Sequence, residues 1–579
     1  MYARNARIIN KKFYEYIVPS ILSGIAIALN EFVDSIIVAN LLGSEAMNAV
    51  SMGMPLMTLY AMLYMLFGVG GSSLYAQCMG KLDRKGAGKS LSVPLLAAGI
   101  ISLVIFAVGI FGADTVADLL SGSVADSQAF TQYTKIILIS APLIIILQAP
   151  LLYLPAAGHP RLGSILNMLA NGINLVMDVV YIKFFGMGVQ GAAWATFTGY
   201  LVAFIILLLM IIFKKCSLQI ARPALRDFPG LKNIVRLSAA SALGQLGLSI
   251  KVTYSIYIAS SYGGAQAVTA FSACIQILSI VSILVCGGVN VLIPMVGTLY
   301  GQKDLHGIHY VMKNVIRFEL ISMVIAVILL QIFPQAVGII YNVTDPQTAA
   351  LCIEAVRIFS LMCICRSIVL IYMYYLQIIR QTTYSVLISI VDGFLGIIIL
   401  SAVLCPVLGL NGLWIAYSAL SVIMMAAILL VNHIKATKSA LDPLTLLEKE
   451  PSGYRLLDAT IHFNVNEVVD YVAQLQELAA ETGVNEHSAN FLALAVEEMC
   501  DYIISNRDSH KCNEIDIITE IYQDHANVSF RSLGSPLDLL NAEAIDTYSN
   551  RDVLKKITSA VEYDYVLGMN QSRVTIDFQ

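Results

Sequence analysis

The first half of this 579-residue chain recurs in its second half at one constant offset in the numbering. The landmarks that carry the repeat are Gly43-Ser-Glu-Ala46 with Gly264-Ala-Gln-Ala267, Gly80/Asp83 with Gly301/Asp304, and Gly188/Gly191 with Gly409/Gly412. Because no gap interrupts the offset, we expect two related bundles that face each other. In repeat architectures of this kind a binding site forms where the two repeats meet.

The composition places these bundles in a membrane. Hydrophobic residues make up 58% of the sequence and charged residues 13%, against roughly 25% charged residues in soluble proteins. A spanning helix needs about 20 apolar residues. Twelve segments qualify, at approximately 13–42, 48–79, 89–113, 132–156, 161–184, 187–213, 233–262, 266–300, 313–341, 350–380, 382–406 and 409–432. We therefore predict an all-α polytopic membrane protein with twelve transmembrane helices in two parallel six-helix repeats, residues 1–215 and 216–440.

Charge predicts the orientation and a separate C-terminal domain. Lys and Arg concentrate at the N-terminus and in alternate loops, which places both termini in the cytoplasm of a multi-pass cell-membrane protein. Residues 442–579 hold 24 Asp and Glu against 9 Lys and Arg, whereas the rest holds 26 Lys and Arg against 15 Asp and Glu. The polar stretch 441–451 predicts a linker.

Residues 452–579 are predicted to form a small cytoplasmic α/β domain. Helices are expected at 468–482 and 488–505, and strands at 462–465, 516–521, 528–533 and 574–578. An anionic membrane leaflet repels so acidic a domain. We therefore expect it to contact the basic loops of its own membrane part, or a basic protein partner, and not nucleic acid.

Ionisable residues inside the predicted spans point to a site in the first repeat. Asp34 lies in the middle of the first span and Asp178 deep in the fifth, where a charge costs on the order of 2.5–3.5 kcal/mol. Asn174 precedes Asp178 by about one helical turn, on the same helix face, and Thr196 lies in a run of small residues that permits close helix contact. If these spans meet, the two carboxylates would share a proton or surround a hard cation such as Na⁺. A static hydrogen-bonded network is the alternative.

The second repeat does not copy this site. Asp34 corresponds to Ser255 and Asp178 to Ile399. The polar residues inside its spans are instead Lys251, Arg366 and Asp392. Pairing of a cation with Asp392 would hold this half rigid, and a substrate-binding role is the alternative.

Two further expectations concern the second repeat. Glu319 is predicted to lie near the end of its span. Tyrosine and methionine side chains of spans eight and ten are predicted mainly to face lipid, with an adaptable pocket as the alternative: Met295, Tyr372, Met373, Tyr374 and Tyr375.

Several of these stretches resemble a known family. Pro19, the segment Asn30-Glu-Phe-Val-Asp34-Ser-Ile-Ile-Val-Ala-Asn-Leu-Leu-Gly43, and the stretches Asn174–Asp178 and Gly191–Thr196 look like the MATE (multidrug and toxic compound extrusion) transporters. The resemblance covers roughly residues 10–435. It implies that Asp34, Asn174, Asp178 and Thr196 form the coupling site for a proton or cation, with Na⁺ at Asp34 and Asp178 as one form, and that helix one bends at Pro19.

The implied function is antiport: uptake of H⁺ or Na⁺ drives export of a small organic, usually cationic, substrate across a lipid membrane, with no other cofactor and no enzymatic reaction. One alternative is a transporter-derived membrane sensor that signals through its tail. Another is a lipid-linked oligosaccharide flippase, whose pyrophosphate headgroup would call for cations in the first repeat. The acidic first repeat argues against the flippase.

The C-terminal domain resembles the histidine-kinase-like ATPase fold of anti-sigma-factor kinases, in the stretches 492–502, 531–538 and 561–570. Glu498 and Gly534 keep that pattern, but Tyr502 replaces the metal-binding asparagine and Ser532 the aspartate that reads adenine. The resemblance therefore implies a degenerate nucleotide pocket, an inactive ATPase and a regulatory role. No GxxxxGK[ST] phosphate loop occurs, which argues against direct drive by ATP.

Overall fold

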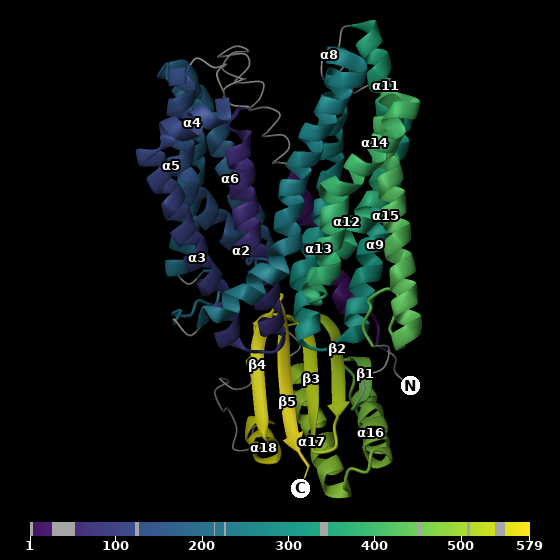
Figure 1. Cartoon of the computed structure of the whole chain (residues 1–579). Helices are drawn as coiled ribbons and strands as arrows, with labels where there is room; N and C mark the ends of the chain where they lie inside the picture. Colours follow the sequence, from purple (N-terminus) through teal and green to yellow (C-terminus); the bar gives the residue numbers. More distant parts are fainter. Residues whose placement is uncertain are drawn as a thin grey trace.

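The chain is described by a computed structural model for residues 4–25, 52–121, 127–213, 215–224, 227–335, 345–448, 453–506, 510–538 and 550–578. A helical membrane part stands on a small α/β domain (Figure 1). Its two groups of helices converge where they meet the sheet and diverge away from it (Figure 1). We call the side next to the α/β domain the tail side.

The first group of helices, the first lobe, begins with a helix described over residues 7–25. It continues with α2 (Met54–Gly80), α3 (Arg84–Phe111), α4 (Ala113–Ser121), α5 (Ser127–Leu151), α6 (Pro160–Asp178), the π-helical segment η1 (Val179–Phe184) and α7 (Val189–Ile212). Local chemistry sets the helix starts. Asp83 caps α3 by accepting a hydrogen bond from the Gly86 amide at 2.8 Å, and α6 begins with Pro160, whose fixed φ suits a first helical position.

The second lobe contains α8 (Pro229–Gly301), α9 (Leu305–Ile332), α11 (Pro346–Ser360), α12 (Met362–Ile378), α13 (Thr382–Ile390), η3 (Val391–Leu395), α14 (Gly396–Leu408) and α15 (Leu410–Ser439). A straight helix of the 73 residues of α8 would be about 110 Å long, more than three times the bilayer core of about 30 Å. The chain turns at Gly264, with φ 61° and ψ −156°, which separates the predicted spans 233–262 and 266–300. An L-residue side chain would be strained at that φ.

The described residues form a multi-pass membrane protein. They contain nine helices that are long and apolar enough to cross a bilayer, or ten if the pair α11 and α12, bent by 43°, counts as one span. Each predicted span from 48–79 onward overlaps described helix, although α5 ends at Leu151 within the span 132–156 and the span 350–380 is broken between α11 and α12. Most of the first predicted span, including Asp34, lies outside the described residues. The count of twelve and the two-repeat organisation therefore stay predictions.

Equivalent positions of the two halves nevertheless have matching local geometry. Leu82 and Lys303 both have positive φ, at 61° and 59°, and Gly188 and Gly409 both have φ 60°. Asp304 caps α9 through the Gly307 amide at 2.7 Å, as Asp83 caps α3. The tail-side loop between α2 and α3 thus has the same form as the loop between α8 and α9.

The C-terminal domain is a five-stranded antiparallel sheet with strand order β1-β2-β3-β5-β4. Its elements are β1 (Arg455–His462), α16 (Val465–Glu481), α17 (Glu486–Ser505), β2 (His510–Ile521), β3 (His525–Gly534), α18 (Asn550–Ile557), β4 (Ala560–Val566) and β5 (Met569–Asp577). Side chains of α16 and α17, such as Leu475 and Val496, share a buried cluster with Ile515, Ile517 and Phe530 of the sheet.

Two sequence predictions for this domain are corrected. The first strand is β1 at Arg455–His462 and not 462–465, because Asn464 caps α16 by accepting a hydrogen bond from the Asn466 amide at 3.1 Å. Strand β4 was not predicted. Its alternation of exposed and buried residues is confined to seven positions.

The linker after α15 packs against the second lobe. The Tyr375 hydroxyl donates to the Thr445 carbonyl at 2.6 Å and Tyr372 to the Leu444 carbonyl at 3.2 Å. Tyr372, Tyr375, Met295 and Met373 are all buried, so the prediction that most of these side chains face lipid is wrong. Sequence hydropathy does not distinguish a lipid-facing tyrosine from one that binds a backbone carbonyl.

Candidate functional site

Asp178 is fully buried at the end of α6, where the α-helix passes into η1. Such π-helical turns are frequent at functional sites. One turn earlier, Asn174 Nδ2 donates to Thr196 Oγ1 of α7 at 3.3 Å, and Thr196 Oγ1 donates to the Ala192 carbonyl at 3.1 Å. The structure therefore joins Asn174 and Thr196 and places Asp178 on the same helix face as Asn174.

A glycine makes this close contact of α6 and α7 possible. A Cβ atom at Gly199 would lie 2.3 Å from the Ala170 carbonyl oxygen and 3.2 Å from Asn174 Cβ. Small residues at helix interfaces let backbones approach closely in membranes. Gly199, just after the run of small residues, thus acts through packing and lets the amide of Asn174 reach the hydroxyl of Thr196.

The polar face of α6 extends toward the tail side through Asn167 and Asn171, which the helical spacing predicts, and is joined by Gln148, which the sequence reasoning missed. Gln148 Nε2 of α5 donates to Asn167 Oδ1 at 3.2 Å and to the Tyr200 hydroxyl at 3.5 Å. Asn171 Nδ2 donates to the Asn167 carbonyl at 3.0 Å. Gln148 has a polar amide side chain inside a predicted span, and that feature of the sequence could have identified it as a candidate site residue.

The N-terminal helix meets α6 at Pro19. Ser164 Oγ donates to the Pro19 carbonyl at 3.1 Å, and the helix is described on both sides of this proline, up to residue 25. The predicted bend at Pro19 stays a prediction. Asp34 lies outside the described residues, so the predicted meeting of Asp34 with Asp178 stays a prediction.

The donor set fits a hard cation in chemistry. Because Asn174 Nδ2 donates to Thr196, Oδ1 of the same amide is the atom left to accept or to coordinate. A carboxylate, an amide oxygen and a hydroxyl are oxygen ligands of the kind that hard cations take. Within the described ranges no group of three His, Cys, Asp or Glu side chains could hold a metal ion. A Na⁺ site at Asp34 and Asp178 stays a prediction.

The second lobe brings Lys251, Arg366 and Asp392 together. Lys251 Nζ of α8 donates to the Asp392 carbonyl in η3 at 3.0 Å and lies 4.8 Å from the ring centre of Tyr417. Arg366 Nε of α12 is 3.6 Å from Asp392 Oδ2. The position that corresponds to Asp34 is Ser255, which exchanges a hydrogen bond of 2.8 Å with the Tyr417 hydroxyl. These contacts tie α8, α12, η3 and α15 to one another.

Glu319 is misplaced by the sequence prediction. It lies in the middle of α9 rather than near the end of a span, and it is fully buried. Gly288 of α8 makes room for it, since a Cβ atom there would come 2.1 Å from Glu319 Oε1. The error arose because α9 already begins at Leu305, more than two helical turns before the predicted start of the span at position 313.

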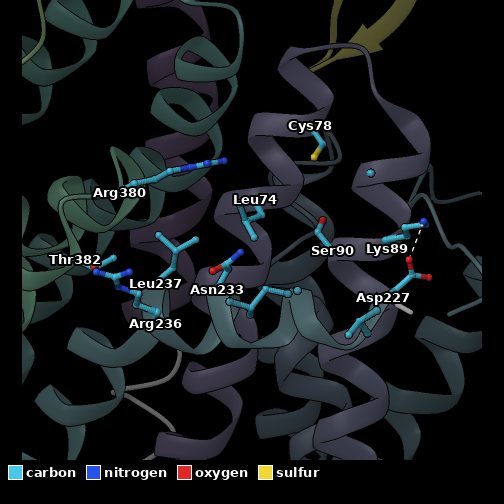
Figure 2. A pocket seen from close by; sticks show the side chains of 14 residues that line it. Leu74, Cys78, Lys89, Ser90, Asp227, Asn233, Arg236, Leu237, Arg380 and Thr382 are labelled. Atoms are coloured by element: carbon cyan, nitrogen blue, oxygen red, sulfur yellow. Dashed lines mark hydrogen bonds and ion pairs between the residues drawn. The ribbon is translucent and has the colours of Figure 1, made fainter. Parts of the chain in front are cut away.

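A cavity of about 610 Å³ lies on the tail side between the lobes, lined by α2, α3, the start of α8 and the turn before α13. Figure 2 shows Arg236 and Arg380 on one side of it and the ion pair of Lys89 with Asp227 on the other, at 2.8 Å. Arg380 Nη2 also donates to Gln77 Oε1 at 2.8 Å. The surplus of basic side chains suits an anionic group better than an organic cation.

The residues predicted to form a degenerate nucleotide pocket lie on α17 and near the end of β3. Glu498 and Tyr502 are one turn apart on α17, and burial, with the Asp538 carboxylate, raises the pKa of Tyr502. Ser532 is buried near the end of β3, and the Gly534 carbonyl accepts a hydrogen bond from Tyr565 at 2.9 Å. Tyr502 offers a phenol where the resemblance expects the amide oxygen of an asparagine as metal ligand, and the degenerate pocket stays a prediction.

Comparisons with known proteins agree on the membrane part. Residues 19–180 match the family model described as MatE. The multidrug export protein MepA of Staphylococcus saprophyticus is 22% identical over 417 residues, which cover 70% of this chain and 89% of that protein. MepA of Staphylococcus aureus strain MRSA252 is 28% identical over 155 residues, 26% of this chain and 34% of that protein.

Solved structures share the fold. A MOP superfamily transporter from Pyrococcus furiosus, described as having a binding pocket of reverse polarity, superposes with a TM-score of 0.68 at 21% identity. An outward-facing multidrug resistance MATE family transporter gives 0.66 at 21% identity. Both matches cover 74% of this chain and 96% of the other chain. Residues 19–180 therefore resemble the MatE family, and the membrane part has the fold seen in a solved MATE family transporter.

Proposed function

We propose that the protein exports small organic cations by antiport with H⁺ or Na⁺, and that its two lobes expose a common pathway alternately to the two sides of the membrane. The observation that carries the proposal is the fully buried Asp178 beside the hydrogen-bonded pair of Asn174 and Thr196. A buried carboxylate in a spanning helix is costly, which favours a functional role over simple packing. The relatives described as multidrug export proteins support the substrate class.

The contact between the N-terminal helix and α6 supports a site shared by two carboxylates. Both helices start on the tail side, because the residues before each of them contact the C-terminal domain. Pro19 touches Ser164, and Asp34 follows Pro19 at nearly the same separation along the chain as Asp178 follows Ser164. Because the rise per residue is the same in both helices, two parallel helical courses would bring both carboxylates to the same depth.

In this mechanism binding of the coupling ion stabilises the carboxylate pair, which is less stable when both groups are ionised and no ion is bound. Two carboxylates in low dielectric repel each other when both are ionised, so the pair would take up a proton or a Na⁺ when it faces the side where that ion is abundant. Asn174 Oδ1 and Thr196 would complete the oxygen donors. Occupation of the site would relieve the repulsion and favour release of the organic cation on the same side.

The charged cluster of the second lobe is assigned a structural role. Lys251 is 3% exposed and is held by the Asp392 backbone and the Tyr417 ring. A cation at this place disfavours a second site for Na⁺ or for an organic cation. We therefore place ion coupling in the first lobe.

We assign the C-terminal domain to the cytoplasm as a regulatory domain without ATPase activity. Tyr502 and Ser532 stand where the ATPases that this domain resembles in sequence use an asparagine and an aspartate. The basic residues of the tail-side loops support this orientation through the positive-inside rule. A purely sensory role is less favoured, because a sensor would not need the buried carboxylate.

The test is efflux from proteoliposomes that contain the purified full-length protein and a fluorescent organic cation. One arm imposes a proton gradient without Na⁺, and the other imposes a Na⁺ gradient at equal pH. We expect Asp34→Asn and Asp178→Asn each to abolish gradient-driven efflux in the coupled arm, while Asp118→Asn, an exposed acid on α4, retains it. Undiminished efflux in both site variants would overturn the mechanism.

A further inference from the structure

A row of five polar side chains crosses the sheet of the C-terminal domain on the face away from α16 and α17. Neighbouring strands pair these residues directly, as Thr460 with Asp516, Asp516 with Arg531, Arg531 with Gln571, and Gln571 with Asp564. The alternating residues Ile515, Ile517 and Phe530 face the helices instead, as the two-residue period of a strand requires. All five polar side chains are buried, each at most 5% exposed. We call them the polar row.

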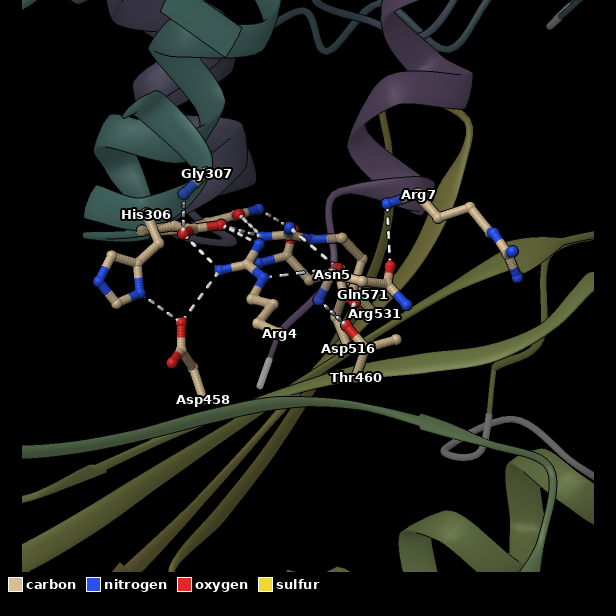
Figure 3. A network of polar contacts seen from close by, with 12 residues as sticks. Arg4, Asn5, Arg7, His306, Gly307, Asp458, Thr460, Asp516, Arg531 and Gln571 are labelled. Atoms are coloured by element: carbon tan, nitrogen blue, oxygen red, sulfur yellow. Dashed lines mark hydrogen bonds and ion pairs between the residues drawn. The ribbon is translucent and has the colours of Figure 1, made fainter. Parts of the chain in front are cut away.

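The membrane part is what buries the polar row (Figure 3). Gln571 Nε2 donates to the Gly80 carbonyl of the first lobe at 3.3 Å, and Gln571 Oε1 accepts from Gln302 Nε2 of the second lobe at 2.6 Å. One side chain of the C-terminal domain thus bonds to both lobes. Arg531 donates to Gln302, and to Asp304 at 3.1 Å. Both of these partners belong to the second lobe.

The first lobe contributes a further attachment at the other end of the row. Arg84 at the start of α3 forms two hydrogen bonds with the Asp564 carboxylate, at 2.9 and 3.0 Å. Gly80 and Arg84 flank the loop between α2 and α3, and Gln302 lies in the loop between α8 and α9. These two loops correspond to each other at the constant offset of the repeat, as Gly80 does to Gly301. The C-terminal domain therefore binds the same loop of both halves.

The two lobes also touch each other at this place. A Cβ atom at Gly80 would lie 2.1 Å from the Thr298 carbonyl oxygen, and one at Gly301 would lie 2.2 Å from the Gln77 carbonyl oxygen. Gln77 Nε2 donates to the Ile378 carbonyl of α12 at 2.9 Å. The polar row therefore spans the line along which the tail-side ends of the lobes meet.

The charges in this interface are balanced and buried. Arg4 of the N-terminal segment binds Asp304 through two contacts of 2.6 Å, and its Nε lies 3.7 Å from Asp516 Oδ2. Burial opposes ionisation of Asp304, but Arg4 and Arg531 outweigh it and hold the pKa of Asp304 well below its usual range. Exposed ion pairs contribute little, whereas loss of one partner from a buried pair is strongly destabilising. Removal of one charged partner from this interface is therefore costly.

Apolar contacts reinforce the polar row. Leu567 in the turn between β4 and β5 belongs to the same buried cluster as Ile8 and Phe13 of the N-terminal helix. The turn fits beneath the first lobe, where a Cβ atom at Gly158 would lie 3.3 Å from the Gly568 amide nitrogen. The domain is thus attached to the first lobe by both the loop after α2 and the segment before α6.

We propose that the C-terminal domain is a clamp that holds the cytoplasmic ends of the two lobes together, and that opening toward the cytoplasm requires its release from at least one lobe. The proposal rests on the alternating access proposed above. The geometric reason is Gln571. Separation of the Gly80 carbonyl from Gln302 on opening must break one of the two hydrogen bonds of this single side chain. The acidic domain thereby sets how often the pathway opens to the cytoplasm.

The test measures the distance between the lobes directly, by pulsed electron spin resonance in lipid nanodiscs. Spin labels are attached at Lys85→Cys in α3 and Lys438→Cys in α15, both exposed and on the tail side, in a full-length chain whose ten native cysteines are replaced. Gln571→Ala removes the bridge from the domain side and Gln302→Ala removes it from the membrane side.

Each clamp variant has a matched control. Glu562→Ala alters an exposed residue on β4 two positions before Asp564, and Lys81→Ala alters the exposed residue that corresponds to Gln302 in the first half. Loss of buried hydrogen bonds, which in Gln302→Ala include the one from the charged Arg531, should raise the population with a longer inter-lobe distance about tenfold in both clamp variants. The controls should match the parent.

An unchanged distance distribution in both clamp variants would overturn the proposal. Gln302→Ala leaves every residue of the C-terminal domain in place, so a shift in that variant supports the clamp independently of the domain's own stability. The outcome is separable from the proposed function. If the parent does not export organic cations but both substitutions still lengthen the inter-lobe distance, the transport proposal alone is contradicted. If the parent exports organic cations but neither substitution changes the inter-lobe distance, the clamp proposal alone is contradicted.

Discussion

Gly80→Ala should push the tail-side ends of the two lobes apart. The added Cβ atom would lie 2.1 Å from the Thr298 carbonyl oxygen and 3.2 Å from Thr298 Cα. Both are backbone atoms that no side-chain rotation can move away, so α2 and α8 must separate to reach ordinary contact. Overpacking of this kind costs about 1–3 kcal/mol, and the better helix propensity of alanine offsets up to about 1 kcal/mol.

From the middle of the overpacking range, about 2 kcal/mol, the net cost is about 1–2 kcal/mol, which corresponds to about a fivefold to thirtyfold shift toward conformations in which the lobes are apart on the tail side. The assay is the distance between spin labels at Lys85→Cys and Lys438→Cys. Gly172→Ala is the matched control, because this glycine of α6 has nothing within 4 Å of the added Cβ atom. A Gly80→Ala distribution that coincides with that of Gly172→Ala would refute the reasoning.

Three further outcomes are expected. Lys251→Met removes a positive charge that compensates the buried carboxylate of Asp392 and should lower the free energy of unfolding by about 3 kcal/mol. The effect is measured as a lower Tm in detergent, which the control Lys183→Met, at an exposed position, should not show. Equal Tm values for the two variants would contradict the structural role of Lys251. Tyr375→Phe removes the bond of 2.6 Å to the linker carbonyl, at a cost of about 1 kcal/mol, and should speed hydrogen exchange in residues 441–448. An unchanged exchange rate would show that the bond does not hold the linker. Asp304 should not make the docking of the C-terminal domain depend on pH between 5 and 8. Its folded-state pKa lies below the ordinary 3.8, so its contribution to stability is present above that value. The contribution is lost only as the pH falls through the lower folded-state pKa. His306, which bonds Asp458 at 2.7 Å, and Asp516 lie in the same interface with raised pKa values and contribute their own pH dependence. A pH dependence of the spin-label distances between pH 5 and 8 that Asp304→Asn removes would contradict the expectation for Asp304.

The first-lobe site was predicted in part from the sequence. The spacing of Asn174 and Asp178 fixes a common helix face, and hydropathy fixes the depth of that face in the membrane. The hydrogen bond to Thr196 could not be predicted in the same way, because it depends on how closely α7 approaches at Gly199. Gln148 joins the polar face from α5 for the same reason.

The interface of the C-terminal domain was beyond sequence reasoning. The excess of acidic residues predicts only an attraction to basic loops. The polar row needs five strands in one register, and it includes Thr460 and Gln571, which carry no charge and no motif. The error at Glu319 has a similar origin, since the start of α9 depends on the cap at Asp304 and not on hydropathy.

The sequence by itself predicted the described membrane helices, the acidic C-terminal domain and the different ionisable residues of the two halves. Each of these depends on local composition and on the periodicity of a single helix. The tertiary structure decided which polar groups meet: Asn174 with Thr196, Lys251 with Asp392, and the polar row with two loops that correspond between the halves. Such contacts require helices and strands to approach within a few ångströms, and that approach is set by small residues, caps and strand register acting together across the whole chain.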